Sequence, residues 1–504
     1  MSNEILLTTL NARYMHCAFG LRYLYANLGA LRARAQIREF TIQQRPVDIA
    51  EQLLASRPKI IGFSIYIWNV SETSEVIALL KQVSPQTIVV AGGPEVSFAN
   101  DLPDLARQVD YIITGPGECS FRQLCEDLLG NRPIASSVIA GEAVSLDALE
   151  LPYAYYNAED IRNRLIYVEA SRGCPFKCEF CLSSLDKTAK PFDLKRFLDA
   201  MDDLYRRGAR NFKFIDRTFN LKVSTSIAIL EFFLQRMDEK LYLHFEVVPD
   251  FLPEKLKQTL ALFPPGALQF EIGVQTFDPD IQKTISRKQD NDSSRDNLRW
   301  LRENTGAHIH ADLIFGLPGD SLENFARSFD QLVALNPQEI QLGILKRLRG
   351  APINRHNDEF ELRYNPAAPY NILSTRDIDF ATMQRVGRCA RFWDMIGNSG
   401  RFPITLPLIL SEAPFDNFLA LSDDLYQLAG STWKISLRRL FALMFTALTE
   451  HRKLEPGRVR DALEADFRQS GEKGAIDFEA PGLEVVARSG VANKRQRQHR
   501  RSSA

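Results

Sequence analysis

Residues 165–181 read LIYVEASRGCPFKCEFC, and this stretch decides how the middle of the chain is interpreted. The apolar residues at its start are typical of a buried parallel strand, which we expect over residues 165–170. Cys174, Cys178 and Cys181 follow directly, separated by three and then two residues. Because functional groups of parallel α/β folds gather where the strands end, the sequence places three thiols at a candidate site.

Three closely spaced cysteines predict a metal centre in a reducing compartment. The chain has only seven cysteines in 504 residues, which disfavours a disulfide scaffold. Structural zinc sites use four ligands, and the nearest histidine in sequence, His244, is remote. Three thiolates on a [4Fe–4S] cluster would leave one iron open for a substrate or cofactor. A zinc site with a distant fourth ligand, or a chance group of buried cysteines, is the alternative.

Strand and helix patterns alternate on the carboxyl side of the cysteines. Helical stretches such as residues 194–207, 224–237 and 321–335 separate apolar, β-rich runs. Six βα units predict a parallel sheet that curls into a partial (β/α)6 barrel over residues 150–365. The expected strands are residues 165–170, 212–216, 243–248, 268–273, 309–316 and 339–345.

The cysteine triplet and its neighbours resemble the radical S-adenosylmethionine (SAM) superfamily. Phe180 stands directly before the third cysteine, as in the pattern of that superfamily. Residues 271–275, EIGVQ, and residues 312–319, DLIFGLPG, resemble two further stretches of the family. The family's Gly-Gly-Glu element after the second strand is missing here, and Asp216 stands in its place.

The resemblance implies a [4Fe–4S] cluster on the three cysteines, with SAM chelating the open iron. Reductive cleavage of SAM would yield a 5′-deoxyadenosyl radical, which the barrel must shield from water. Glu246 and Gln275 could equally be internal hydrogen-bonding residues of the barrel, and Gly316 could belong to a plain turn. The SAM-binding residues that the resemblance implies are Phe180, Asp216, Glu246, Gln275, Gly316 and Pro318.

Residues 1–140 predict a separate doubly wound α/β domain with about five parallel strands. Three loops at the expected strand ends suit a large ligand: residues 64–69, residues 92–94 (GGP) and residues 115–118 (GPGE). Tight turns without a ligand are the alternative. The expected strands are residues 5–10, 37–42, 60–67, 87–91 and 111–114, with helices at 21–35, 47–56 and 71–83.

A doubly wound domain ahead of a radical SAM barrel resembles the cobalamin-binding class of these enzymes. The Asp-x-His-x-x-Gly motif of the methionine synthase cobalamin module is absent, and the nearest stretch is residues 14–20, YMHCAFG. Its histidine could also be an ordinary loop residue. The cobalamin-binding residues that the resemblance implies are His16, Ser64, Gly92, Gly93, Pro94, Gly115 and Glu118.

Strand signals fade near residue 370, and the pattern predicts a small α-helical domain over residues 370–490. Residues 10–16 (LNARYMH) and 340–346 (IQLGILK) resemble a bacterial group of cobalamin-associated radical SAM proteins that ends in a helical domain of unknown role. Residues 491–504 contain KRQRQHRR, which is typical of a solvated, flexible tail. Contact with RNA or an anionic surface is the alternative for this tail.

Charge and apolar patterning exclude several classes of protein. The 62 basic and 63 acidic residues leave a net charge of -1, which disfavours a dedicated nucleic-acid binder. We find no run of 18 apolar residues and no basic leader before an apolar core. We therefore expect a cytoplasmic protein without membrane contact.

We expect a cobalamin-associated radical SAM enzyme, with methyl transfer to an unactivated carbon as the leading reaction. Its implied cofactors are a [4Fe–4S] cluster, SAM and cobalamin, and an external one-electron reductant such as flavodoxin or ferredoxin would supply electrons. The substrate, small or macromolecular, stays open. A non-methylating rearrangement or an RNA modification is the second hypothesis, and a non-enzymatic iron–sulfur redox sensor is the third.

Overall fold

The computed structural model describes residues 4–474 and 476–478. The chain divides into two compact units, Met1–Gln384 and Arg385–Ala504. The run predicted as a solvated tail, residues 491–504, lies outside the described residues. No helix among the described residues has the length and apolar character that crossing a membrane requires.

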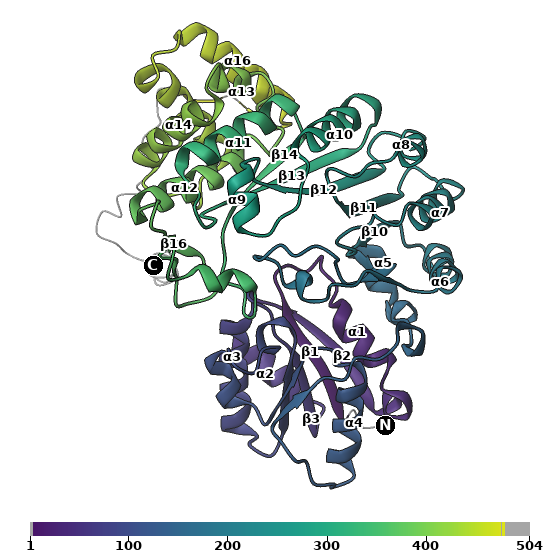
Figure 1. The fold of residues 1–504 in the computed structure, drawn as a ribbon. Coiled ribbons are helices and arrows are strands. Elements are labelled where there is room, and N and C mark those ends of the chain that lie inside the picture. Colours follow the sequence, from purple (N-terminus) through teal and green to yellow (C-terminus); the bar gives the residue numbers. More distant parts are fainter. Residues whose placement is uncertain (1–3, 475, 479–504) are drawn as a thin grey trace, which may run out of the picture. The chain divides into compact units, whose positions relative to one another are not determined.

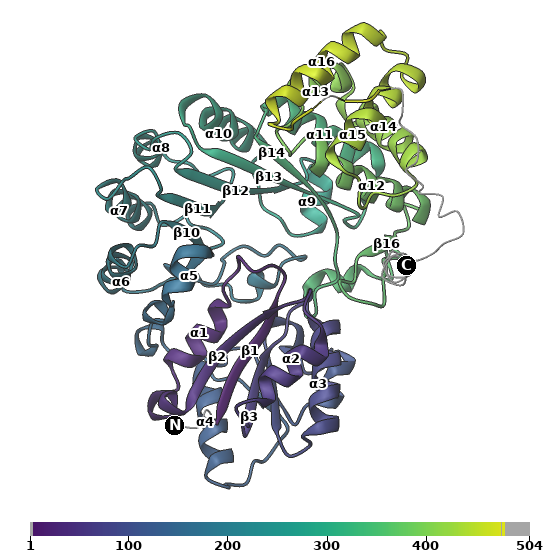
Figure 2. The ribbon, with the colours of Figure 1, turned by 180° about the vertical axis from the view of Figure 1, so that it is seen from behind.

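The first sheet has six parallel strands in the order β2-β1-β3-β4-β5-β6. Helices α2 and α3 cover one face of this sheet and helices α1 and α4 cover the other (Figure 1 and Figure 2). This is the doubly wound arrangement that the sequence predicts. The strands are β1 Ile5–Asn11, β2 Ala35–Thr41, β3 Ile60–Ser64, β4 Ile88–Gly92, β5 Tyr111–Thr114 and β6 Val138–Ala140; the helices are α1 Phe19–Ala26, α2 Pro46–Leu54, α3 Val70–Val83 and α4 Glu118–Leu129.

Two details of this sheet differ from the sequence-based expectation. The sixth strand, β6, is a three-residue edge strand, too short to show an apolar run. The helix expected over residues 21–35 ends at Ala26, and a 3-10 helix, Gly29–Arg34, follows it. Gly29 has φ 55°, a left-handed conformation that interrupts the helix and that glycine adopts without strain.

The second sheet also has six parallel strands, in the order β14-β13-β12-β11-β10-β7. Strands β7 and β14 each pair on one side only within this sheet, so the partial barrel is open between them. The strands are β7 Ile166–Val168, β10 Asn211–Phe214, β11 Tyr242–Val247, β12 Leu268–Gln275, β13 His308–Phe315 and β14 Glu339–Ile344; the helices are α6 Leu194–Arg206, α7 Val223–Leu234, α8 Glu254–Leu260, α9 Pro279–Thr284, α10 Asn291–Asn304 and α11 Leu322–Leu335.

The barrel strands present different residue types on their two faces. Every second residue of β12 and β13 is fully buried, and the residues between them are only half-buried. The buried set is apolar, for example Phe270, Ile272 and Leu313. The other set carries charged and polar side chains such as Glu271 and His310. This alternation fixes the register of the strands.

Unit 2 is helical, as the sequence predicts, and its core is rich in phenylalanine. Phe441 contacts both Phe402 and Phe467. Asp466 is fully buried, and its carboxylate accepts hydrogen bonds from the backbone nitrogens of Ile404 and Thr405 at the start of α13. The helices are α12 Phe380–Ile396, which starts in unit 1, then α13 Thr405–Leu410, α14 Pro414–Ala429, α15 Leu437–Thr446 and α16 Pro456–Gln469.

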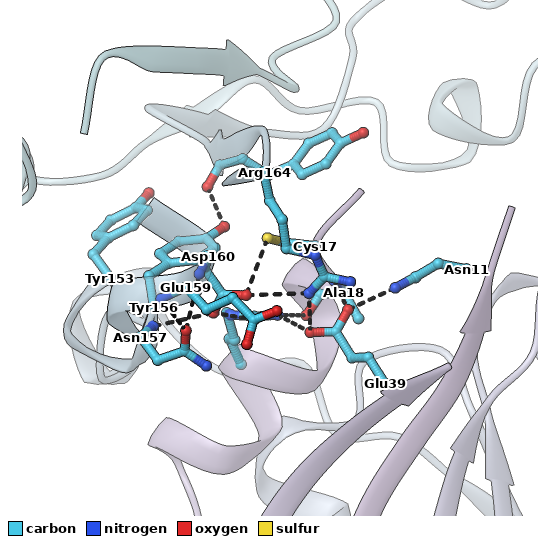
Figure 3. Close-up of polar contacts among 12 residues, drawn as sticks. Asn11, Cys17, Ala18, Glu39, Tyr153, Tyr156, Asn157, Glu159, Asp160 and Arg164 are labelled. Atoms are coloured by element: carbon cyan, nitrogen blue, oxygen red, sulfur yellow. Dashed lines mark hydrogen bonds and ion pairs between the residues drawn. The ribbon is translucent and has the colours of Figure 1, made fainter. Parts of the chain in front are cut away.

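A buried group of four charges joins the first sheet to helix α5 (Ala158–Asn163), which precedes the barrel (Figure 3). Arg22 contacts Glu39 at 2.8 Å and Asp160 at 2.7 Å. Arg164 contacts the same two carboxylates, each at 3.1 Å. All four side chains are less than 10% exposed. Each buried charge thus has two partners of opposite sign.

We expect Arg22→Met to lower the free energy of unfolding by about 3–5 kcal/mol, because it leaves two buried carboxylates with one guanidinium. Arg34→Met is the matched control, since Arg34 is a partly exposed partner of Glu4 and such pairs contribute at most about 1 kcal/mol. Urea denaturation followed by circular dichroism measures both variants. If both variants lose the same free energy of unfolding, the stabilising role of the four buried charges is contradicted.

Candidate active site

A cavity of about 960 Å³ lies at the carboxyl ends of the barrel strands. All three cysteines of the triplet line it, together with residues from the ends of β11, β12 and β13. The lining includes Cys174, Phe176, Cys178, Phe180, Cys181, Ser184, Arg217, Thr218, Glu246, Asp250, Glu271, Gly273, Gln275, Arg287, Lys288, Gln289 and Asp312. The structure therefore brings together residues that lie more than a hundred positions apart in the chain.

Residues 173–189, between β8 and β9, carry the three cysteines, and we call them the cysteine loop. The loop starts at a glycine that no other residue could replace without strain. Gly173 has φ 96°, and a Cβ on it would lie 2.0 Å from the backbone oxygen of Thr188. The next residue, Cys174, donates its backbone N–H to Asp186 O at 2.9 Å. Short antiparallel strands, β8 (Ser171–Arg172) and β9 (Lys190–Pro191), pair across the two ends of the loop. The loop is therefore closed at its base.

Two side chains hold the interior of the cysteine loop. Glu179 is almost fully buried, and its carboxylate accepts hydrogen bonds from Ser286 at 2.5 Å and from His356 at 2.9 Å. Arg287 donates to the sulfur of Cys178 at 3.5 Å and also to the backbone oxygen of Gly273. Burial raises the pKa of the Cys178 thiol, and the charge of Arg287 opposes that rise. A thiolate at this position thus has a cationic hydrogen-bond donor.

The triplet fits a cluster better than a single ion. Within the described residues, no group of three His, Cys, Asp or Glu side chains is arranged to hold a metal ion. A [4Fe–4S] cluster makes a different demand, because each thiolate binds its own iron. Three free cysteines face one cavity, and the donor from Arg287 suits a ligating sulfur.

The six residues proposed from the sequence to bind SAM divide into two groups. Phe180, Glu246 and Gln275 line the cavity. Asp216, Gly316 and Pro318 are not part of the lining. Gly316 and Pro318 lie in a buried turn after β13, where a Cβ on Gly316 would lie 2.8 Å from Ile372.

Asp216 supports the start of the cysteine loop. Its carboxylate accepts hydrogen bonds from the backbone N–H of Ala170, at 2.9 Å, and from the hydroxyl of Ser171, at 2.6 Å. The side chain is 3% exposed. Burial raises the pKa of Asp216 to about 7, although these hydrogen bonds oppose the rise. Both acceptor oxygens are therefore used inside the protein.

Gln275 combines strain with an unused polar atom. Its φ is 69°, which is unusual for a residue other than glycine, and the register between β12 and β13 shifts at this position. The side-chain amide folds over Gly273, where a Cβ would lie 2.5 Å from its nitrogen. Its oxygen is buried and has no hydrogen-bond partner among the described residues. Such a strained, incompletely paired group in a cavity fits a ligand contact.

Sequence analysis missed a layer of charged groups on the barrel strands, of which Glu271 and Asp312 also line the cavity. Glu271 accepts hydrogen bonds from Lys213 at 3.1 Å and from His244 at 3.0 Å. His310 lies 3.3 Å from Asp312 on the neighbouring strand β13. Burial raises the pKa of Glu271, but its hydrogen bond to His244 and the charge of Lys213 hold it well below its usual range. The alternating polar residues of LQFEIGVQ and HIHADLIF were the available sequence signal.

A second cavity, of about 1210 Å³, lies over the ends of β3, β4 and β5 between helices α1 and α4. Five of the proposed cobalamin-binding residues line it: Ser64, Gly92, Gly93, Gly115 and Glu118. A Cβ at Gly115 would meet nothing within 4 Å, so the backbone is open to a ligand there. The glycines in the lining let a large ligand approach the backbone closely.

Three of the residues proposed for cobalamin have other surroundings. His16 and Pro94 are not part of the lining. The ring of His16 makes a hydrogen bond to the hydroxyl of Tyr167, at 2.8 Å, and burial lowers its pKa. Glu118 lines the cavity, but its carboxylate accepts a hydrogen bond from Arg172 at 2.8 Å. Arg172 also contacts Glu169 at 2.7 Å.

Comparison with protein families identifies three matching regions of the chain. Residues 5–125 match the B12 binding domain, and residues 168–332 match the radical SAM superfamily. The chain therefore contains a B12-binding domain and a radical SAM domain. Residues 358–484 match the family described as protein of unknown function (DUF4080). The predicted fold class and the predicted cofactors, a [4Fe–4S] cluster, SAM and cobalamin, are thereby confirmed.

Two individual relatives match more than half of the chain. The cobalamin-dependent radical SAM methyltransferase TokK of Streptomyces tokunonensis is 24% identical over 362 residues, covering 62% of this chain and 51% of the relative. This chain thus spans about half the length of that relative. An uncharacterized methyltransferase of Pyrococcus horikoshii is 25% identical over 318 residues, which cover 56% of this chain and 67% of the relative.

A solved structure shares the fold. The radical SAM methyltransferase TsrM of Kitasatospora setae, with cobalamin and a [4Fe–4S] cluster bound, has a TM-score of 0.57 and 18% identity. The match covers 73% of this chain and 81% of that chain. At this identity the likeness shows the fold alone.

We expect Asp216→Asn to reduce the pH dependence of stability. Because burial holds the pKa of Asp216 near 7, the folded state keeps a proton that the unfolded state loses above its lower, ordinary pKa. The stability of the wild type therefore falls as pH rises through this window, and the asparagine variant lacks that component. Melting temperatures at pH 5 and pH 7.5 measure the difference. If Asp216→Asn shows the same difference in melting temperature between pH 5 and pH 7.5 as the wild type, the buried, protonated carboxyl is contradicted.

Proposed function

We propose that this protein transfers a methyl group from SAM to a carbon atom of its substrate, using the [4Fe–4S] cluster and cobalamin. The observation that carries the proposal is that a single residue, Gly173, separates a lining residue of one cavity from a lining residue of the other. Arg172 lines the cobalamin cavity, and Cys174 lines the cavity of the cluster. Two cofactors held on either side of one short strand suit a reaction that uses both. The names of the relatives, which are methyltransferases, support the same reaction.

The residues of the chain have distinct parts in this proposal. When bound, the cluster supplies an electron for SAM cleavage and cobalamin carries a methyl group. Cys174, Cys178 and Cys181 hold the cluster, and Arg287 stabilises the Cys178 thiolate by its hydrogen bond. Gln275 offers an unpaired acceptor to SAM. The side chains of Glu246 and Arg217 form a close pair at the cavity, 2.6 Å apart, which offsets their charges.

The proposal extends to the domain boundaries, the outer residues of the cobalamin site, the location of the protein and its electron donor. We propose domain boundaries at residues 1–140, 150–365 and 370–490, with His16 and Pro94 as outer residues of the cobalamin site. The protein would work in the cytoplasm and take electrons from flavodoxin or ferredoxin. A strained Gln275 in a cavity is not needed by a redox sensor, which favours an enzyme over that hypothesis. A non-methylating radical reaction stays as the alternative.

Anaerobic reconstitution tests the proposal without a known substrate. With the cluster, cobalamin, SAM and a strong reductant, we expect both 5′-deoxyadenosine and S-adenosylhomocysteine, the latter reporting methyl transfer from SAM. Omission of cobalamin should remove S-adenosylhomocysteine alone. If S-adenosylhomocysteine never forms, the non-methylating alternative replaces methyl transfer.

We expect Cys178→Ala to abolish 5′-deoxyadenosine formation and to lower the iron content, because the cluster loses one of three ligands. Cys119→Ala is the matched control, since Cys119 lies at the start of α4 and lines neither cofactor cavity. Liquid chromatography of the products and iron analysis measure both. Normal SAM cleavage by Cys178→Ala would overturn the cluster assignment.

A further inference from the structure

Residues 347–356, which begin three positions after the end of β14, contact loops of both cofactor sites. We call them the bridging segment. One end meets the loop after β4, which begins with the cavity-lining Gly93. The other end meets the cysteine loop. The segment belongs to neither cavity lining.

Arg349 is the contact on the cobalamin side. Three of its nitrogens reach three different residues: Nε contacts Glu95 at 2.7 Å, Nη1 contacts Asp101 at 2.6 Å, and Nη2 donates to the Tyr370 hydroxyl at 3.1 Å. The side chains of Arg349 and Glu95 are 10% and 3% exposed. Arg347 adds a second contact to Asp101, at 2.7 Å. A buried guanidinium with three separate partners fixes both the position and the direction of the loop.

The backbone at this end is also closely packed. Gly350 has φ 76°, and a Cβ on it would lie 2.2 Å from the ring of Phe98. Phe98 lies between Glu95 and Asp101 in the same loop. Any side chain at position 350 would push this loop away. The ion pairs of Arg349 and the packing of Gly350 against Phe98 thus both act on residues 95–101.

Glu179 is the contact on the cluster side. Its backbone oxygen accepts the N–H of Ile353 at 2.9 Å, and its carboxylate accepts from His356 at 2.9 Å. The side chains of Glu179 and His356 are 4% and 11% exposed. Glu179 stands directly between Cys178 and Phe180. The bridging segment therefore contacts the cysteine loop at its centre.

We propose that the bridging segment sets the spacing between the cobalamin and the cluster, with Arg349 and His356 as positioning residues. Neither residue touches a cofactor cavity, so each acts through a loop: Arg349 through residues 95–101 and His356 through Glu179. Only a few residues separate the two contacts, so the segment has little slack. The proposal goes beyond methyl transfer and needs only that both cofactors bind.

The spacing is measurable in the loaded protein. Cob(II)alamin and the reduced cluster are both paramagnetic, so pulsed electron paramagnetic resonance reports the distance distribution between them. We expect a narrow distribution in the wild type and a broader or shifted one in Arg349→Gln and His356→Gln. Since a misplacement of about 1 Å can cost about 100-fold in rate, methyl transfer should fall in the same variants.

Arg376→Gln is the matched control, because Arg376 is a half-exposed partner of its neighbour Asp377. It should leave the distribution unchanged. If Arg349→Gln loses a cofactor, Arg349→Lys is measured in place of that variant. Lysine keeps the positive charge but cannot reach three partners, so the distance distribution should still broaden. The proposal is overturned if two variants keep the wild-type distance distribution at full iron and cobalamin content. These variants are His356→Gln and the position-349 variant that was measured. This outcome is independent of whether the enzyme methylates.

Discussion

The two-residue strand β8 is the constraint on which both cofactor sites depend. Ser171 donates to Asp216, and Arg172 contacts Glu118 and Glu169. A fully extended chain covers at most about 3.6 Å per residue, so Arg172 and Cys174 cannot be more than about 7 Å apart along the backbone. A shift of this strand therefore moves a wall of one cavity and the first cluster ligand together. The buried carboxylates around β8 resist such a shift.

Arginine–carboxylate pairs recur wherever distant segments meet in unit 1. Arg22 joins β2 to α5, Arg172 joins α4 to the barrel, and Arg349 joins the loop after β4 to the bridging segment. Buried pairs of this kind add little net stability compared with apolar contacts of the same shape. A misplaced partner, however, leaves a buried charge unpaired. The pairs thus penalise other arrangements of the segments more than they stabilise this one.

Much of the architecture could be predicted from the sequence because its signals are local. Continuous apolar runs indicated the parallel strands, and the spacing of Cys174, Cys178 and Cys181 indicated the cluster loop. Contacts between distant residues could not be predicted in this way. The sequence suggested Asp216 as a SAM-binding residue and Glu118 as a cobalamin-binding residue, but it gave no sign of their contacts with Ser171 and Arg172. The contacts of Arg349 with Glu95 and Asp101 have no local pattern at all, since these two partners lie some 250 positions earlier.

The charged layer inside the barrel limits how its interior can be altered. Lys213, His244 and Glu271 come from three adjacent strands and share one carboxylate oxygen. Replacing Glu271 removes the shared acceptor of Lys213 and His244, and replacing either of these removes one of the two donors to Glu271. A variant with only one of these three residues replaced is therefore expected to be less stable than the starting protein. A barrel interior of different polarity then requires two or three substitutions at once. In a lineage of such proteins, these three positions should be inherited and exchanged as a set.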